Sequence, residues 1–424
     1  MKTKIRKRIP NTHPALRNCL RVLGLGIALA AWLPRAGAAT HYVWQGSTNP
    51  VPPYTNWATA SPEIQAAVNE SADGDLVLVT NGVYNAGGAH LTASPLVLSR
   101  VAVTNDLEIR SVNGPSVTII EGQYAVGDQE PVRCVGLSAR AVFSGFTLTN
   151  GGVIHGHEQS VMNPEDTYGG GAFLNVTSVI TNCVVTACVG GGIFTEEHAV
   201  GSLIVDSVIR GNESETAGGG INIICEGVTV SRCSILNNVI KSTSGISAGG
   251  GGIAVLVKSP EPPIVVRDCV IAGNFSEADQ PGGGGGVMAD HIQLLQCSIF
   301  NNRTLGEGGG VLILFEGLVA MTNCVVYHNQ AVVDDNISLP LKVDEVDLSH
   351  VCTYPDLSDD ERVNGDNIIT NAPLLAGMLN PHLTAASPCR AVGDAAAAEP
   401  GETDIDGEPR VVGGTLDILS LIHI

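Results

Sequence analysis

The sequence is poor in aromatic and basic side chains. Phe, Trp and Tyr make up 4% of its 424 residues, and 22 Lys and Arg stand against 42 Asp and Glu. A chain this acidic repels the phosphates of nucleic acids and of anionic lipids, which excludes both as expected partners. The only tryptophans after residue 38, Trp44 and Trp57, precede the repeats described below, so the repeats have no indole ring for stacking on sugars.

Long apolar runs are also missing after the N-terminus, so we expect no transmembrane segment in the mature chain. Residues 1–38 combine a basic start, the apolar run VLGLGIALAAWL and the small-residue sequence Ala36–Ala38, which is the order of a secretory signal peptide. Eight of the 22 Lys and Arg and none of the 42 Asp and Glu lie in this segment, so the mature net charge is −28, with 14 basic against 42 acidic side chains. We expect a protein that is secreted or held at the cell surface.

Six runs of glycine divide the middle of the sequence, and each is followed by an apolar residue. The runs are Gly169–Gly171, Gly190–Gly192, Gly218–Gly220, Gly249–Gly252, Gly282–Gly286 and Gly308–Gly310. A second signature, polar-Cys-x-apolar-x-x-Asn, follows each run after 11–17 residues, as in RCSILNN and DCVIAGN. Self-similarity at a period of about 20–35 residues predicts a solenoid. The short, β-branched, alternating stretches between the glycines predict parallel coils stacked roughly 4.8 Å apart.

The glycines and the two signature positions have structural explanations. Glycine adopts positive φ and lets neighbouring coils approach at a tight corner, so six copies in a β pattern favour turns over a phosphate-binding loop. The cysteines alternate with inward apolar positions and are expected to stack as buried, mostly free thiols: Cys183, Cys233, Cys269, Cys297 and Cys324. The asparagines at the strand ends are expected to form a ladder of side-chain hydrogen bonds: Asn212, Asn238, Asn274, Asn302 and Asn329.

The two ends of the repeat region have their own patterns. SPEIQAAV predicts a short capping helix with Ser61 as N-cap and Pro62 at the first helical position, within an N-terminal cap and first coil over residues 39–95. Coils are expected over residues 96–331, and an acidic, loop-rich section over residues 332–418. Cys352 and Cys389 lie in that section, outside the cysteine column, and are the best-placed pair for a disulfide.

Residues 41–84, SGFTLTNGG and the glycine, cysteine and asparagine coils resemble the right-handed parallel β-helix proteins of the pectin-lyase-like superfamily of bacteria. The coils also resemble the repeats of polymorphic outer-membrane adhesins. CTYPD, NPHLTAASPCR and TDIDGEPRVVGGTLDI are similar to a choice-of-anchor Q region. The resemblance implies an all-β fold, a single-stranded right-handed parallel β-helix, over nearly all of the mature chain. The choice-of-anchor region normally continues from DI into GAYE, whereas LSLIHI follows here, so we expect residues 419–424 to be a non-native tail.

One insertion between coils, residues 153–171, holds a cluster of metal-ligating residue types. His155, His157 and Glu158 are close in sequence, and Asp166 returns near them. Two histidines and a carboxylate suit zinc or iron. Their spacing matches no strong motif, so we favour a solvated polar loop.

A second candidate is the residue that precedes the cysteine position of each coil, which we expect to point outward. In three coils this residue is Asp206, Arg232 and Asp268, an acid–base–acid column. The resemblance implies a comparison with pectate lyases, in which carboxylates hold calcium beside a basic residue that removes the proton α to the uronate carboxyl. A surface charge ladder worth about 0–1 kcal/mol per pair is the simpler explanation, because two carboxylates are few for calcium.

The sequence therefore predicts an exported structural or adhesive module that contacts polysaccharide or another cell-surface component, and it assigns no cofactor to this module. The alternative is a polysaccharide lyase, or a related carbohydrate-active enzyme, that uses calcium.

Overall fold

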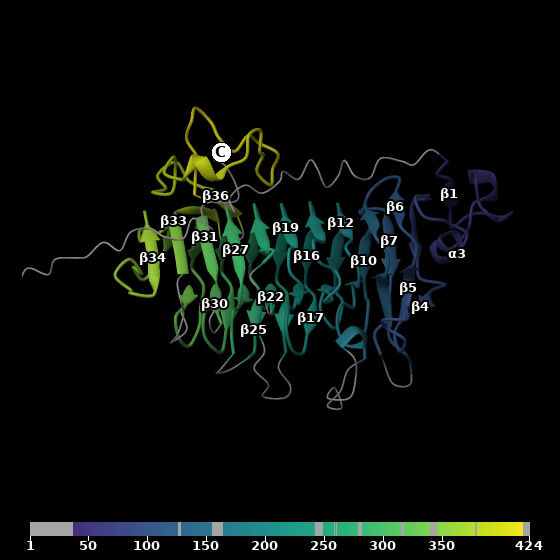
Figure 1. Cartoon of the computed structure of the whole chain (residues 1–424), viewed down its shortest axis with the longest axis horizontal. Coiled ribbons are helices and arrows are strands. Elements are labelled where there is room, and N and C mark those ends of the chain that lie inside the picture. Colours follow the sequence, from purple (N-terminus) through teal and green to yellow (C-terminus); the bar gives the residue numbers. More distant parts are fainter. Residues whose placement is uncertain are drawn as a thin grey trace, which may run out of the picture. The chain divides into compact units, whose positions relative to one another are not determined.

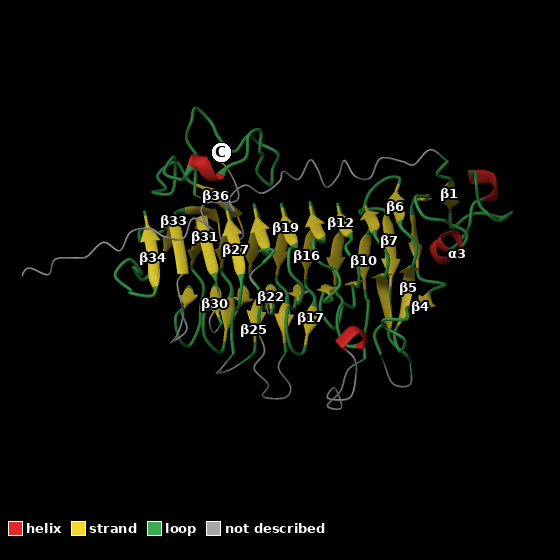
Figure 2. Ribbon diagram, in the orientation of Figure 1, coloured by secondary structure: helices red, strands yellow, loops and turns green. Residues whose placement is uncertain are grey.

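The structure, a computed structural model, describes residues 37–125, 129–154, 164–241, 249–257, 259, 261–278, 282–314, 318–339, 346–377 and 380–418. Most of the expected signal peptide and the whole expected tail, residues 419–424, lie outside the described residues. Strands dominate the described chain (Figures 1 and 2). No helix within these ranges is long and apolar enough to span a membrane.

Parallel strands stack in rows, one strand of each row per coil. The first row is β1 (Thr40–Val43), β2 (Leu76–Val79), β6 (Leu107–Ser111), β9 (Ala141–Ser144), β12 (Val179–Thr181), β15 (Leu203–Val205), β19 (Thr229–Ser231), β23 (Val265–Arg267), β27 (Ile292–Leu295), β31 (Val319–Tyr327), β33 (Val346–Thr353) and β34 (Val363–Asp366). The second row is β3 (Gly82–Tyr84), β7 (Thr118–Glu121), β10 (Thr147–Thr149), β13 (Val184–Thr186), β16 (Val208–Arg210), β20 (Ser234–Leu236), β24 (Val270–Ala272) and β28 (Ser298–Phe300), and it ends on the second half of β31.

Two further rows complete the coils. The third row is β5 (Leu98–Val103), β8 (Val132–Leu137), β11 (Ala172–Leu174), β14 (Ile193–Thr195), β18 (Ile221–Ile223), β22 (Ile253–Val255), β26 (Val287–Ala289), β30 (Val311–Ile313) and β32 (Ile337–Ser338), with β4 (Ala89–His90) antiparallel at its start. The short fourth row is β17 (Glu213–Ser214), β21 (Val239–Ile240), β25 (Phe275–Ser276) and β29 (Arg303–Thr304). The expected parallel β-helix is confirmed.

Single residues in the left-handed region turn the chain at each corner. Asp206, Arg232 and Asp268 join the first row to the second with φ of 50°, 50° and 54°. Glycine takes the corner before the third row, as at Gly250 with φ of 72°. The coils come so close there that a Cβ on the adjacent Gly251 would lie 2.5 Å from a carbonyl oxygen of the next coil.

The interior of the coils contains a continuous amide ladder. Asn238 donates from Nδ2 to Asn274 Oδ1 (3.0 Å), and Asn274 donates in the same way to Asn302 Oδ1 (2.9 Å). Each Oδ1 also accepts the backbone N–H of the preceding asparagine, and each Nδ2 also donates to a strand carbonyl such as that of Ile235. The ladder begins at Asn212 and passes through Asn329. These hydrogen bonds satisfy backbone groups at a buried corner that no strand pairs.

The cysteine column is buried, and all of its members are free thiols. The sulfurs accept backbone N–H groups of the neighbouring coil, as the asparagine Oδ1 atoms do. For example, the backbone N–H of Cys297 donates to the sulfur of Cys324 at 3.4 Å. Ser207 takes the same place in its coil and accepts the N–H of Cys183 at 3.1 Å. Burial raises the pKa of the Cys183 thiol to about 11, which keeps it protonated and unreactive at neutral pH.

The N-terminal helix differs from the expectation. We expected Ser61 to cap it, but helix α3 (Ile64–Asn69) begins after Glu63, which makes no side-chain cap. The Ser61 hydroxyl accepts the backbone N–H of Glu63 (3.1 Å), while the Ser61 backbone pairs with β1 through hydrogen bonds to Tyr42 and Trp44. Ser61 thus extends the sheet and covers its first edge, which displaces the helix start.

The coils also continue beyond residue 331, where we expected them to end. β32, β33 and β34 pair in parallel with the coils before them. The glycine signal is lost there because Asp334 takes the left-handed corner with φ of 54°, and the carbonyls of Asp335 and Asn336 accept the N–H groups of Gly310 and Val311. Aspartate tolerates this conformation, so the turn persists without glycine.

The end of the chain folds back over the outer face of the second row (Figure 1). The hairpin of β35 (Leu375–Gly377) and β36 (Asn380–Leu383) leads into loops that run to residue 418. Strands β24, β28, β31 and β33 contribute apolar side chains to a buried cluster with this segment: Val270, Ala272, Phe300, Val325, Cys352, Leu383, Cys389 and Ile418. We call residues 380–418 the C-terminal cover.

Candidate functional site

The acid–base column is only partly exposed. Arg232 donates from Nε to Asp206 Oδ1 (2.6 Å) and from Nη2 to Oδ2 (2.9 Å), a bidentate pair that solvent reaches from outside. These hydrogen bonds raise the pKa of Arg232. A guanidinium held this way keeps its proton, so it is poorly suited to remove one from a substrate.

Asp268 points away from the coil interior as expected, but it is not at the surface, and we correct the prediction of an exposed column. Its side chain is 1% exposed, because the C-terminal cover lies over it. Arg410 of the cover donates to Oδ1 from both Nε (2.9 Å) and Nη2, and Arg267 donates to Oδ2 at 3.2 Å. Arg267 also pairs with Glu402 of the cover. Burial alone would lower the pKa of Arg267, but the charges of Glu402 and Asp268 outweigh it and raise that pKa.

Calcium binding at this column, the alternative that we did not favour, would have to displace the arginines that contact both oxygens of Asp268. Within the ranges that the structure describes, no group of three or more His, Cys, Asp or Glu side chains is placed to hold a metal ion. The column thus consists of the surface ion pair of Asp206 and Arg232 and of a buried aspartate. We call the buried ion pairs among Asp268, Arg267, Glu402 and Arg410 the buried clasp, because they join the cover to the coils.

The proposed metal loop is described only at its end. His155, His157 and Glu158 lie outside the described residues. Asp166 is fully buried, and its Oδ1 accepts hydrogen bonds from Ser94 (2.8 Å) and from the backbone of Leu96 (3.2 Å). This aspartate therefore anchors the end of the insertion to the coils.

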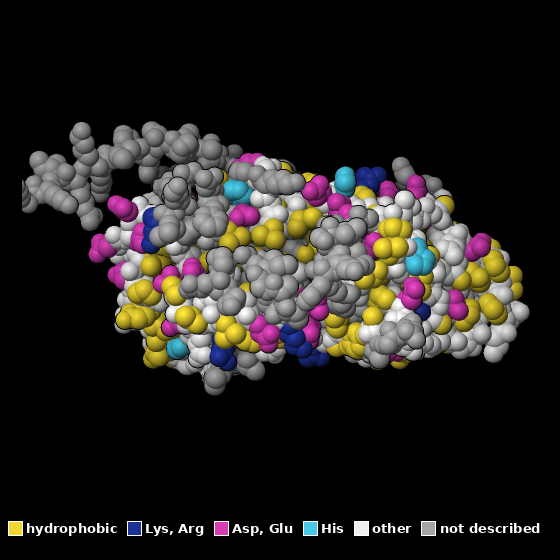
Figure 3. Space-filling view, turned by 90° about the horizontal axis from the view of Figure 1, so that it is seen from below, with side chains coloured by type: hydrophobic (Ala, Val, Ile, Leu, Met, Phe, Trp, Pro, Cys, Tyr) yellow, Lys and Arg dark blue, Asp and Glu magenta, His cyan; other side chains and the backbone are white. Residues whose placement is uncertain are grey.

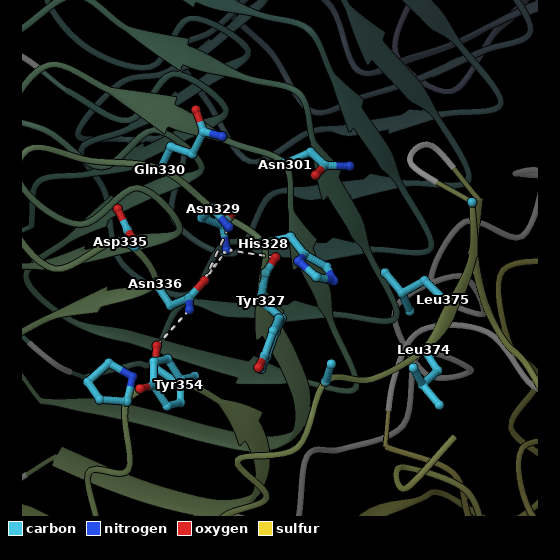
Figure 4. Close-up of a pocket in the computed structure, with 13 residues that line it drawn as sticks. Asn301, Tyr327, His328, Asn329, Gln330, Asp335, Asn336, Tyr354, Leu374 and Leu375 are labelled. Carbon is cyan, nitrogen blue, oxygen red and sulfur yellow. Dashed lines mark hydrogen bonds between the residues drawn. The ribbon is translucent and has the colours of Figure 1, made fainter. Parts of the chain in front are cut away.

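A groove opens where the last coils meet the start of the C-terminal hairpin, with a volume of about 860 Å³. Figure 4 shows its lining, with Leu374 and Leu375 on one side, Asp335 and Tyr354 on the other, and Tyr327 between them. Its floor is the end of the amide ladder, where Asn329 and Asn336 are linked by a hydrogen bond of 3.1 Å.

Two tyrosines and a histidine give the groove its aromatic surface. Tyr354 is 61% exposed, and Asn336 fixes its backbone by donating to its carbonyl at 2.7 Å. Tyr327, the last residue of β31, donates to the carbonyl of Thr370 (3.3 Å), and burial raises the pKa of its phenol. The His328 ring meets the Tyr327 ring edge to face at 4.9 Å, from a corner residue with φ of 58°. Rigid strand ends thus present these rings to solvent.

The remaining lining supplies polar groups without basic ones. Asn301 reaches the groove from one coil, and Gln330 and Asp335 reach it from the next. Asp335 Oδ1 accepts the backbone N–H of Ala331 (2.9 Å), which fixes its carboxylate. Amides, phenols, a carboxylate and apolar side chains together are the groups that bind sugar hydroxyls and stack on sugar faces.

Comparison with known proteins identifies the fold. Residues 134–336 match the family model described as the right handed beta helix region. The crystal structure of pectate lyase Pel9A aligns with a TM-score of 0.54 at 11% identity, over 92% of this chain and 98% of that chain. The chain folds as a right-handed parallel β-helix, the fold of that pectate lyase.

Two more distant solved structures align with this β-helix. A pectin methylesterase mutant in complex with a hexasaccharide has a TM-score of 0.37 at 12% identity, over 77% of this chain and 93% of its own. A rhamnogalacturonan lyase has a TM-score of 0.34 at 9% identity, over 78% of this chain and 87% of its own. Among curated proteins no sequence matches that of this β-helix.

Our sequence analysis missed the groove residues of the β-helix. Tyr327 and His328 stand in NCVVYHN, which we used only as a frame for the repeat, and Tyr354 stands in CTYPD. A usable signal was present, because the second-row residues in register with Tyr327 change from polar to aromatic along the coils: Arg210, Leu236, Ala272 and Phe300. An aromatic residue at an outward position marks a surface that differs from the rest of the sheet.

Cys352 and Cys389 lie side by side under the cover of the β-helix. Both are fully buried free thiols in the same apolar cluster. The hydrogen bond between the two thiols raises the pKa of the Cys352 thiol, and burial raises it further. A disulfide between them stays a prediction for protein recovered from an oxidising compartment, where alkylation without reductant tests it.

Proposed function

We propose that this β-helix is an exported bacterial module that binds polysaccharide at or outside the cell surface and does not cleave it. The proposal rests on the groove, in which Tyr327, His328 and Tyr354 lie beside amides on a rigid sheet end. Pectate lyase shares the fold, and from that likeness we take only the expectation of a carbohydrate partner.

Binding without cleavage agrees with the chemistry of the column. A lyase needs a base close to deprotonation and cations that hold the uronate carboxylate. Arg232 forms an ion pair with Asp206, and Asp268 is buried between Arg267 and Arg410. An adhesive or structural role needs only the stable coils and one binding surface, and the strongly acidic surface keeps such a module soluble.

A sedimentation assay with insoluble cell-wall polysaccharides tests this proposal. The mature protein is incubated with each polysaccharide in calcium or in chelator, and the bound protein and the ultraviolet absorbance of unsaturated uronide ends are both measured. We expect binding to at least one polysaccharide, equal with and without calcium, and no rise in absorbance.

Replacing Arg232 by Asn provides the control, since asparagine occupies the same left-handed corner at Asn182 and Asn323. We expect this variant to bind as the wild type does. A calcium-dependent absorbance that R232N abolishes would make the protein a lyase and overturn the proposal.

A further inference from the structure

The groove has almost no charged lining. Of the thirteen residues that line it, none is Lys or Arg, and Asp335 is its one carboxylate. Arg303, whose backbone pairs with Gln330, directs its guanidinium to the Phe275 ring, 5.5 Å from the ring centroid. The face drawn in Figure 3 carries scattered Asp and Glu with few basic side chains.

This composition opposes an acidic polymer. A polyuronate carries one carboxylate per sugar, and each carboxylate that loses water in a groove needs a cationic or strong hydrogen-bonding partner. The fixed carboxylate of Asp335 would repel such a ligand, and the net charge of the mature chain adds a repulsive field at long range.

The same composition suits an uncharged glycan. Amide groups of Asn301 and Gln330 can donate to and accept from hydroxyls, and the Asp335 carboxylate can accept from them. The exposed ring of Tyr354 and the 44% exposed side chain of Leu374 offer faces for the C–H side of a sugar ring.

From the lining we infer that the groove binds an uncharged glycan and discriminates against polyuronates. This inference rests on the proposed function and specifies its ligand class. The discrimination is electrostatic, so it weakens as salt screens the carboxylates.

Affinity electrophoresis provides the test, with soluble polysaccharides cast into native gels. The probes are uncharged glucan, galactan and mannan, together with polygalacturonate and its fully methyl-esterified form, in which a methyl group replaces the charge of each carboxylate. We expect retardation by at least one uncharged polymer and none by polygalacturonate. Replacing Tyr354 by Ala should weaken the retarding interaction at least about tenfold, as the loss of a central aromatic contact does.

Two variants separate the outcomes. Val83→Ala, at a 41% exposed position in β3, is the control for Y354A and should bind as the wild type does. Gln330→Arg adds a cation to the lining and should create binding to polygalacturonate. Binding of wild-type protein to polygalacturonate as tightly as to its ester, or retardation that Y354A leaves unchanged, would overturn the inference while the proposed function stands. Failure of every polymer to bind would overturn both.

Discussion

Replacing Asn274 by Ala should destabilise the β-helix by roughly 3–5 kcal/mol, because the change leaves several buried groups unpaired. Asn274 makes four hydrogen bonds through its side chain, with Asn238 twice, Ile235 and Asn302. Its amide is fully buried, so water cannot replace these partners. We expect a clear fall in the midpoint of thermal unfolding followed by circular dichroism.

The matched control is Asn237→Gly, one residue before the ladder. Asn237 is exposed and left-handed, with φ of 53°, and its neighbours in the same corner column are Gly211 and Gly273. The free energy of unfolding of N237G should therefore lie within about 0.5 kcal/mol of the wild-type value. Equal stability of N274A and N237G would show that the ladder does not hold the coils together.

Replacing Asp268 by Asn should release the C-terminal cover. The substitution keeps the shape of the side chain but removes the carboxylate charge that Arg267 and Arg410, which are 7% and 0% exposed, both contact. An uncompensated buried charge costs about 3–5 kcal/mol. We expect limited proteolysis to cut within residues 391–418 at protease concentrations that leave the wild type intact, with stronger binding of a hydrophobic dye to the uncovered strands.

Asp206→Asn is the control for D268N, because the same substitution is made at the same corner of another coil. Asp206 has a side chain that is 45% exposed, so its pair with Arg232 should contribute only about 0–1 kcal/mol. If D206N and D268N resist the protease equally, the buried clasp is not what fixes the cover.

The repeat was readable from the sequence because each part of it has a local cause. Glycine runs mark corners with positive φ, and the asparagine column marks a corner that needs amide partners. The last coils were missed because Asp334 makes the same corner without glycine. Ser61 was misread because a serine before a helix can equally extend a strand, and only the pairing partner decides.

The candidate site was much harder to read than the fold. The burial of Asp268 depends on Arg410, which lies 142 residues later in the chain, and no local pattern records such a contact. One signal was available, because β16 ends on an outward Arg210 whereas β24 is apolar on both faces and β28 ends on an outward Phe300. Strands buried on both faces lose their alternation, so the sequence could have predicted a cover but not its residues.

Hydrogen exchange followed by mass spectrometry tests most directly the claim that glycan binds in the groove. The mature protein is exchanged with and without an oligosaccharide of the uncharged polymer that retards it. We expect protection in peptides that contain residues 327–330, 354–355 and 372–377, with no change around Asp206 and Arg232. Protection confined to the Asp206–Arg232 column, with the groove peptides unchanged, would contradict the account.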